Sequence, residues 1–413
     1  MECSSLRHLR AGTVSNALRV CLALAGVFLR VVLETPPAPA LVRGPYLQRP
    51  DDRTVEILWR TSSILVGSVS YGRPGTVFRT ASDAAAAQAH AARLSDLEAG
   101  KIYEYQVFGD GAPLSPVLSF RAPREAADDE IAFAVVGDTA GRTVPAQIAS
   151  LLRFTSPDLL LHTGDVVYPD GRLDDYDPEF FGPMAALLAT TPVMPILGDH
   201  DVKTADGAPF FSVFDLPDNG LTAQPRYYSF RQGDAEFFCL DVESSEYGED
   251  SDQYRWLERS LAESTAVWKF VTVFEPPFTS ENSNVVERLI LSPLFERFGV
   301  DIVFSGHEHL YERSKPIRMF GASGKPVTYV VEGGGGASLS SFDPEDFSAF
   351  VAAVHGYVTV RVSNDVLRLE AHDAAGSIID SVTMRKGADG SANDASPLAI
   401  SEPPPAGVSA GRR

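Results

Sequence analysis

The sequence predicts a small N-terminal β-sandwich followed by a larger α/β domain that contains two sheets. Two observations lead to this prediction. The first third of the chain holds short strand-like segments separated by Gly, Pro and Asp, and beyond a polar joint at residues 121–130 apolar strands alternate with amphipathic helices. The length of 413 residues fits two domains with terminal extensions. Because hydrophobic residues make up 44% of the chain, it can bury a core of ordinary size.

Residues 1–40 have the pattern of a leader that directs export. Three arginines precede the apolar run Val20 to Leu29, and small residues at 38–40 offer a cleavage site. The run is shorter than the roughly 20 apolar residues that a membrane-spanning helix needs. We therefore expect a signal peptide and an exported protein, periplasmic or extracellular, without stable membrane insertion. Arg30 interrupts the apolar segment, so a disordered N-terminus is the alternative.

Charge and cysteine content limit the partners of the chain. It has 35 basic and 55 acidic residues and a formal net charge of -20, which repels nucleic acid and anionic membranes at long range. We therefore expect no nucleic-acid binding. Of three cysteines, only Cys239 lies outside the leader, so no internal disulfide is expected. Cys239 falls in an apolar strand pattern, which favours a small buried hydrophobe.

The first domain is expected to be entirely β. Strand-like segments are readable at Thr54–Arg60, Leu65–Tyr71 and Tyr103–Phe108, and turn-forming residues separate them. Trp59 falls on the first strand, where burial of an aromatic ring is its default role. The spacing therefore predicts a small sandwich.

The second part of the chain is expected to be α/β, with helices near residues 145–154, 252–263 and 285–298. The expected strands are Ile131–Val136, Leu159–His162, Val193–Leu197, Phe270–Phe274 and Asp301–Phe304. A later β-rich run is interpreted as the second half of the same two-sheet domain, with strands at Thr328–Val331, Tyr357–Val362, Leu367–His372 and Ile378–Met384. Gly, Ser, Ala and Pro dominate residues 386–413, which predicts a disordered tail.

Four of these strands end in a polar group that follows a glycine. Asp138, Asp165 and Asp199 stand at three strand ends. His307 and His309 stand at a fourth, two residues apart, and so face the same way in an extended stretch. The glycine lets the backbone turn tightly under whatever the carboxylate binds. Because three converging carboxylates repel one another, the set predicts a cation site.

In the order of its motifs the chain resembles the calcineurin-like metallophosphoesterases. The motifs are Gly137-Asp138, Gly164-Asp165-Val166-Val167-Tyr168, Gly198-Asp199-His200-Asp201 and Gly306-His307-Glu308-His309-Leu310-Tyr311-Glu312-Arg313. Tyr168 and the Tyr-Glu-Arg after the last histidine point to the purple acid phosphatase branch. The segment 41–123, with its motifs at 43–48 and 58–61, is similar to the fibronectin-III-like domain that precedes the catalytic domain in plant-type members.

This resemblance implies a specific architecture and metal set. The fold would be an N-terminal fibronectin-III-like β-sandwich at 41–123, followed by a four-layer α/β/β/α metallophosphoesterase domain at 124–385. The first metal, Fe(III) bound by a tyrosinate, would be held by Asp138, Asp165, Tyr168 and His309. Asp165 would bridge to a second metal, which His307 also binds. Mixed oxygen and imidazole ligands suit Zn, Mn and Fe(II), so the second metal stays open.

The sequence departs from the family at the second metal. Family members have Asn where Asp199 stands and a histidine where Phe274 stands, and the histidines expected near residues 280–284 are absent. Phenylalanine cannot bind a metal, so this site is empty, weakened, or rebuilt around Asp199, His307 and Glu275. His200 alone remains of the outer set, and we expect it to stabilise the substrate or protonate the leaving oxygen.

The function that the resemblance implies is hydrolysis of a small phosphate ester, of acid phosphatase or phosphodiesterase type, by a metal-bound hydroxide attacking in line. Whether the substrate is a monoester, a diester or a nucleotide stays open. One alternative is a metal-binding relative with weak catalysis, and another is an exported adhesion module. Two further features have structural interpretations: His162 as a packed group behind the ligands, and the glycines at 333–336 as a close approach of the backbone to the metal site.

Overall fold

The computed structural model describes residues 39–125, 130–222, 225–281, 285–321, 323–387, 390 and 392–394. The described residues from Ala40 onward belong to one compact unit. Nearly all of the expected leader, and most of the expected tail, lie outside the described residues. Among those described, no helix has the length and apolar character needed to span a membrane.

The N-terminal part is a six-stranded antiparallel sheet with its own core. Its strands are β1 (Leu41–Asp51), β2 (Thr54–Gly72), β3 (Arg79–Leu94), β4 (Ile102–Gly109), β5 (Ala112–Pro113) and β6 (Leu118–Arg121). Two strands expected between residues 54 and 71 are a single strand, β2, because β3 pairs with both of its halves. Trp59 is buried in the core of this sheet, as predicted.

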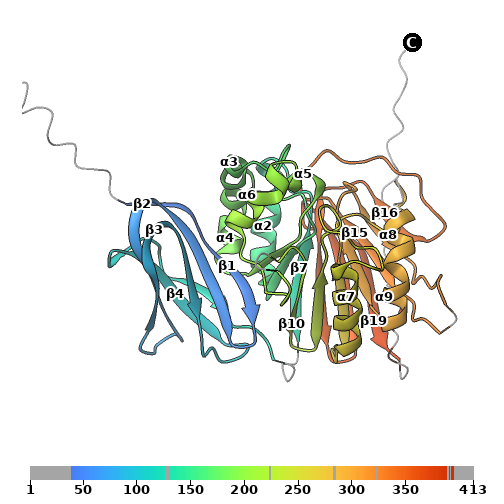
Figure 1. Cartoon of the computed structure of the whole chain (residues 1–413), viewed down its shortest axis with the longest axis horizontal. Helices are drawn as coiled ribbons and strands as arrows, with labels where there is room; N and C mark the ends of the chain where they lie inside the picture. The colour runs from blue at the N-terminus through green and yellow to red at the C-terminus, as the bar shows by residue number, and fades with distance from the viewer. Residues whose placement is uncertain are drawn as a thin grey trace, which may run out of the picture. The chain divides into compact units, whose positions relative to one another are not determined.

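The rest of the described chain contains two seven-stranded sheets (Figure 1). The first contains β7 (Ile131–Val136), β8 (Leu159–His162), β9 (Val193–Pro195), β17 (Gly356–Ser363), β18 (Val366–Asp373), β19 (Ile378–Lys386) and β20 (Ala392–Asp394). The second contains β10 (Tyr228–Gln232), β11 (Ala235–Cys239), β12 (Trp268–Thr272), β13 (Ile302–Ser305), β14 (Tyr311–Ser314), β15 (Thr328–Glu332) and β16 (Ser348–Ala352). The late β-rich run divides between the sheets: β17, β18 and β19 complete the first sheet because β17 pairs with β7, whereas β15 pairs with β13 in the second.

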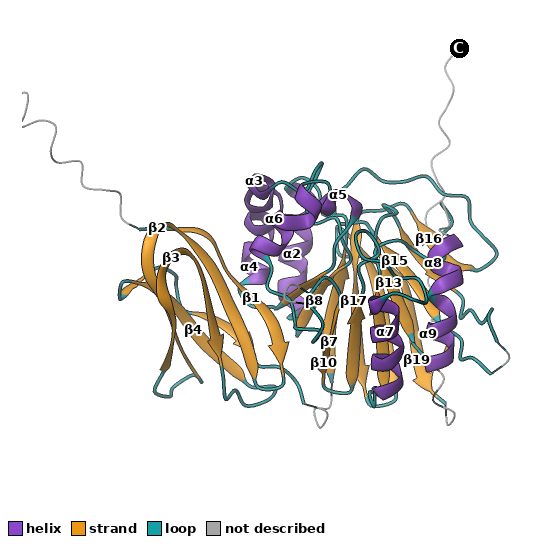
Figure 2. Ribbon diagram, viewed as in Figure 1, coloured by secondary structure: helices purple, strands orange, loops and turns teal. Residues whose placement is uncertain are grey.

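The two sheets face each other, and helices cover their outer sides. The ring of Phe133 in the first sheet contacts Phe237 and Phe270 of the second, each with 5.1 Å between ring centroids. On one side lie α2 (Thr143–Thr155), α3 (Leu173–Tyr176), α4 (Gly182–Leu188), α5 (Asp199–Val202) and α6 (Ala208–Val213). On the other lie α7 (Asp252–Glu263), α8 (Val285–Ile290) and α9 (Ser292–Phe298). The layer order is therefore α/β/β/α (Figure 2).

Strand direction places the polar strand ends together. Strands β7, β8 and β9 are parallel, and so are β11, β12, β13 and β15, so that the loops after them gather at one end of the two sheets. Cys239, at the end of β11, is fully buried as predicted.

Several boundaries differ from the sequence prediction; the strand expected at Val193–Leu197, for example, ends at Pro195. The strand expected to include Phe274 ends at Thr272, so Phe274 belongs to the following loop. The helix expected at 285–298 is two helices, because Pro293 has no N–H and lies in the first turn of α9, which begins at Ser292. Residues 392–394, expected in the disordered tail, pair with β19 as β20.

Candidate metal centre

Asp138, Tyr168 and His309 bring three different ligand atoms together. The Tyr168 hydroxyl donates to Asp138 Oδ1 at 3.2 Å and lies 3.2 Å from His309 Nε2. The third side of this triangle, from His309 Nε2 to Asp138 Oδ1, is 3.5 Å. Neighbouring ligands on one metal ion lie about 3 Å apart when each bond is about 2.1 Å long. The three atoms are therefore spaced as ligands of one ion.

The backbone at these strand ends is held in an unusual conformation. Asp138, Asp165 and His307 have φ angles of 56°, 52° and 69°. This left-handed region is costly for residues with a side chain, by roughly 1 kcal/mol or more at each position. Three such residues follow β7, β8 and β13. The fold therefore holds these side chains in one place although the backbone conformation there is unfavourable for residues other than glycine.

Burial makes the charges of this group costly without a cation. Burial, and then the charges of Asp138, Asp201 and Asp199, raise the pKa of Asp165 to about 10. Burial also raises the pKa of Asp138, with His309 opposing the shift. The pKa of Tyr168 lies far above its usual value because the phenol is buried beside two carboxylates. A bound cation would reverse these shifts, so the residues present fit a metal ion.

His309 is oriented by its second ring nitrogen. Its Nδ1 lies 2.6 Å from the carbonyl oxygen of Ser338, which leaves Nε2 facing Tyr168 and Asp138. Burial alone would lower the pKa of His309, but the hydrogen bond and charge of Asp138 outweigh it and raise the pKa. Metal-binding histidines usually donate their other N–H in this way to a carbonyl or a carboxylate.

The second half of the centre contains Asp199, His200 and His307. Asp165, Asp199 and His200 each offer a ligand atom within 4.8 Å of the other two. His307 lies farther out, with Nδ1 3.9 Å from Asp199 Oδ1 and Nε2 3.7 Å from Glu275 Oε1. Asp199 Oδ2 also pairs with Lys203 Nζ at 3.0 Å. The six residues expected to bind metal therefore lie in one region, but its two halves differ in how tightly they are assembled.

Phe274 occupies the side of this half nearest His307. Its side chain is fully buried, and its ring centroid lies 5.1 Å from that of His307 in an edge contact. A Cβ atom added at Gly164 would come within 2.3 Å of Phe274 Cδ2, so the ring presses on the turn that carries Asp165. Hydrocarbon therefore fills the place where the resemblance expects a ligand.

Additional acidic groups, missed by the sequence analysis, surround the second half. Burial, and then the charges of Glu275, Asp199 and other carboxylates, raise the pKa of Glu243 to about 8. Glu243 Oε1 is buried without a hydrogen-bond partner, and so is Oε2 of Glu287. Both reach the region from segments that carry no motif, after β11 and in α8. Only the packing of distant segments could have revealed them.

Asp201 is a further missed residue, and its role is to hold the loops. It is completely buried and accepts hydrogen bonds from the N–H groups of Gly198 and Val166 and from the Tyr176 hydroxyl. It therefore ties the Asp199 turn to the Asp165 turn. Its place in the Gly-Asp-His-Asp motif was visible in the sequence, but its inward direction was not.

Two predicted supporting features lie behind the ligands. His162 is fully buried, and its Nε2 lies 3.0 Å from the Thr139 hydroxyl. The glycine segment passes close to the site, as predicted, since a Cβ at Gly333 would lie 2.8 Å from Asp138 Oδ2 and one at Gly335 would lie 2.2 Å from the Gly137 carbonyl. No side chain larger than hydrogen fits at either position without movement.

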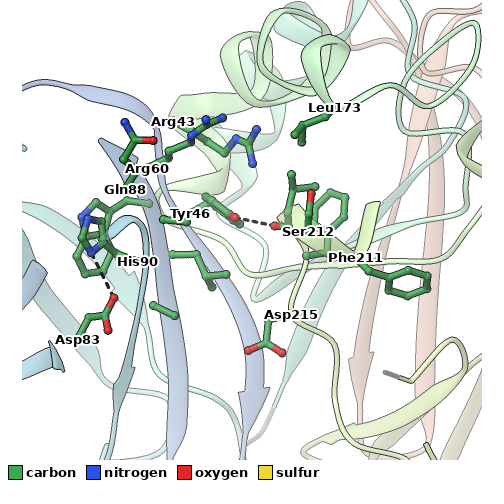
Figure 3. Close-up of a pocket in the computed structure, with 16 residues that line it drawn as sticks. Arg43, Tyr46, Arg60, Asp83, Gln88, His90, Leu173, Phe211, Ser212 and Asp215 are labelled. Atoms are coloured by element: carbon green, nitrogen blue, oxygen red, sulfur yellow. Dashed lines mark hydrogen bonds and ion pairs between the residues drawn. The ribbon is translucent and has the colours of Figure 1, made fainter. Parts of the chain in front are cut away.

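A large cavity lies elsewhere, between the N-terminal sheet and the segment around α6 (Figure 3). Its volume is about 590 Å³, and Arg43, His90 and Phe211 are among the residues that line it. The Tyr46 hydroxyl donates across this junction to the Val213 carbonyl at 2.6 Å. None of the expected metal or catalytic residues lines the cavity, so size alone does not locate the chemistry.

Comparison with protein families gives two matches in the second part of the chain. Residues 131–311 match the calcineurin-like phosphoesterase family, and residues 327–381 match the iron/zinc purple acid phosphatase-like protein C family. The first match contains every residue expected to bind metal. The second covers the glycine segment, β15 and β16 of the second sheet, and β17, β18 and the start of β19 of the first.

Individual relatives agree with these families. Purple acid phosphatase 15 of Arabidopsis thaliana is 28% identical over 60% of this chain and 53% of its own length. Acid phosphatase type 7 of Danio rerio is 26% identical over 72% of this chain and 77% of its own. The chain thus spans only about half of the Arabidopsis protein. The structure of purple acid phosphatase PPD1 from yellow lupin seeds has the same fold, with a TM-score of 0.73 and 19% identity over 84% of this chain and 74% of that one.

Proposed function

Because the chain belongs to the purple acid phosphatase-like branch of the calcineurin-like phosphoesterases, we propose that it hydrolyses small phosphate esters at the centre described above. The observation that carries the proposal is the triangle of Asp138, Tyr168 and His309 ligand atoms beside the buried Asp165 carboxylate. Burying these acidic groups together costs free energy unless a cation binds between them. The residue types are also those that the family uses as metal ligands.

We assign the ligands as follows. Asp138, Asp165, Tyr168 and His309 would hold the first metal, Fe(III). Asp165 would be shared with a second metal, Zn, Mn or Fe(II), which Asp199 and His307 also bind. Bound metals would supply positive charge that neutralises phosphoryl oxygens and activates the attacking water.

The protein itself supplies fixed geometry. The left-handed turns at Asp138 and Asp165, together with the glycine segment, hold the carboxylates before any ligand arrives. His309 is set by the Ser338 carbonyl, and the Asp165 turn is set by Asp201. Because the groups need little rearrangement on binding, more of the interaction energy remains for the reaction.

The proposal also includes the domain boundaries, export of the protein and the class of substrate. The N-terminal sheet would be the fibronectin-III-like sandwich, with boundaries at 41–123, before a catalytic domain at 124–385. Residues 1–40 would direct export, and the substrates would be small molecules and not nucleic acids. The net charge of -20 supports the last point.

Phosphatase assays beside elemental analysis test the proposal. The purified protein, supplied with Fe and Zn, should hydrolyse p-nitrophenyl phosphate or its bis ester, and Asp138→Asn should lose both iron and activity. Lys203→Ala is a suitable control because Lys203 is an exposed neighbour of the second half. A folded sample that retains less than about 0.1 equivalent of metal would contradict the whole assignment.

A second candidate function is metal binding with weak turnover. Phe274 favours it, because a buried hydrocarbon stands where the family places a ligand of the second metal. Retention of one iron without measurable hydrolysis would support this candidate over the first.

A further inference from the structure

We propose that His200 is a ligand of the second metal in this chain, and that it replaces the histidine missing at position 274. The sequence had suggested instead that His200 contacts the substrate or protonates the leaving oxygen. This inference rests on the proposed function only because it takes Asp165 and Asp199 as part of a metal centre. It concerns metal binding and is independent of turnover.

The first support is distance. Asp165, Asp199 and His200 form a compact group whose ligand atoms all lie within 4.8 Å of one another. Two ligands on opposite sides of one metal ion are separated by about 4.2 Å, so the spacing of this group is close to that of a set of metal ligands. The backbone N–H of His200 donates to Asp165 Oδ1 at 2.9 Å, which holds the start of α5 against the Asp165 carboxylate.

The second support is the tautomer of the ring. His200 Nδ1 makes a short contact with the carbonyl oxygen of Pro169, and a carbonyl can only accept a hydrogen bond. The proton is therefore on Nδ1, and in the neutral ring the lone pair is on Nε2. Histidines that bind metals are commonly fixed in this way, with the other N–H on a backbone carbonyl. A neutral ring that donates to a phosphate oxygen would need its proton on the outward nitrogen.

The third support is an internal comparison with His309. Its Nδ1 also contacts a backbone carbonyl, that of Ser338 at 2.6 Å, and its Nε2 faces the ligands of the first metal. The rings of His200 and His309 each contact the ring of Tyr168, with centroid separations of 4.4 and 6.2 Å. Two histidines with the same carbonyl contact thus stand next to the same tyrosine.

His307 lacks this support. Within the described part of the chain, neither of its ring nitrogens is hydrogen-bonded to a backbone carbonyl, and they lie 3.9 Å from Asp199 and 3.7 Å from Glu275. Phe274 packs against its other side. With a hydrocarbon on the His307 side of the second half, the additional imidazole has to come from elsewhere, and His200 is already beside Asp165 and Asp199.

Metal titration of the full-length protein tests the assignment without any activity assay. Protein loaded with one equivalent of iron is titrated with Zn²⁺ by calorimetry, and bound metal is counted by elemental analysis. His200→Ala should weaken the Zn²⁺ site by about 10-fold or more while leaving the iron in place. The matched control Lys203→Ala removes the exposed ion-pair partner of Asp199, just after the end of α5, and should not weaken Zn²⁺ binding.

Rescue separates a ligand from a merely structural residue. In the double variant His200→Ala with Phe274→His, the restored histidine should recover most of the lost Zn²⁺ affinity. If His200→Ala binds Zn²⁺ within about twofold of the natural protein, or if the natural protein binds no second metal, the inference is wrong. Failure of the proposed function looks different: two metals bind, His200→Ala loses one of them, and phosphate esters are not hydrolysed.

Discussion

The two halves of the metal centre differ in how their ligands are assembled. In the first half, three ligand atoms from Asp138, Tyr168 and His309 lie within 3.5 Å of one another. In the second half, His307 keeps 3.7 to 3.9 Å from its carboxylate neighbours, and Phe274 fills the place of a ligand. The residues proposed for the first metal are therefore closely assembled, whereas those proposed for the second are more widely spaced.

The surroundings of the two halves differ as well. The first is closed by the glycine segment, which leaves no room for side chains. The second is surrounded by the carboxylates of Asp199, Glu243 and Glu275, and burial beside them raises the pKa of Glu243 to about 8. Where the resemblance expects a neutral histidine, the chain thus has a hydrocarbon ring with extra negative charge around it, which attracts a divalent cation but opposes an anionic substrate.

Substitution of Asp165, the residue proposed to bind both metals, should give the largest loss of activity. Asp165→Asn removes one negative charge from the position between the metals, and we expect hydrolysis to fall by roughly 100-fold or more. Turnover of p-nitrophenyl phosphate and metal content measure the change. A variant that keeps both metals and most of its activity would show that the halves do not share Asp165.

Tyr168 tests the first half alone. As a tyrosinate on Fe(III) it should give a visible charge-transfer band, and Tyr168→Phe should abolish that colour while leaving the fold intact. Iron affinity should fall by about 10-fold or more because one of three assembled ligands is lost. Absorption spectra of iron-loaded protein decide the matter, and a colour that survives Tyr168→Phe would exclude this residue as the ligand.

Part of the fold and of the first half of the centre could be predicted from the sequence, because local sequence patterns determine these elements. Strands β7 and β8 begin and end where predicted because short apolar runs are bounded by turn residues. Helix α7 also matches, since Ser251 caps it and its apolar residues follow a helical period. Asp138 and Asp165 lie within three residues of these strand ends, so their convergence could be expected.

What the sequence did not show depends on tertiary contacts. Strand β3 was missed because its alanine-rich segment has only Thr80 among the β-branched and Phe, Tyr or Trp residues that mark strands. Glu243 was missed because it follows β11 without a motif and meets Glu275 only when β11 and β12 pair. The tautomer of His200 depends on the carbonyl of Pro169, which no sequence pattern reports.

Phe274→His should make the second half more like the first. The new imidazole should raise occupancy by Zn²⁺ or Mn²⁺ and increase phosphoesterase rate. Because position 274 is fully buried, we also expect a loss of about 1 to 3 kcal/mol of stability in the metal-free protein. Metal stoichiometry and melting temperature measure both effects.

Glu275→Gln in the natural sequence serves as the paired variant for this position. If Glu275 has become a ligand, its variant should lower metal content and rate together. Unchanged metal content in both variants, with a lower melting temperature for Phe274→His, would argue against a second site at this strand end.

His162 supports the first half from behind and should affect stability more than chemistry. Burial lowers its pKa to about 3, so the folded protein keeps the ring neutral. Below pH 6.5 the unfolded chain binds a proton that the folded chain does not, so stability falls as the pH falls from 6.5 toward 3. We expect roughly 1 to 2 kcal/mol of this loss by pH 5. In His162→Gln the melting temperature should fall less between pH 7 and 5, and an equal fall would refute the assignment.

Asp199→Asn should have the smallest effect and is the most direct comparison with the family residue at this place. The amide keeps an oxygen that can bind a metal and removes a charge that opposes anionic substrates, so activity should change by no more than about threefold and in the direction of a gain. The ion pair with Lys203 would be lost, but it is exposed and contributes only about 0.3 to 0.5 kcal/mol. Rates on p-nitrophenyl phosphate and Zn²⁺ affinity should be measured together. If Asp199→Asn loses the second metal, the Asp199 carboxylate is needed to bind it. Without a histidine at position 274, the site would then depend on the negative charge of Asp199. If the metal stays and the rate rises, His200 and His307 are sufficient to hold the second metal without the Asp199 charge. The two halves would then differ in their residues but not in their ability to bind a metal.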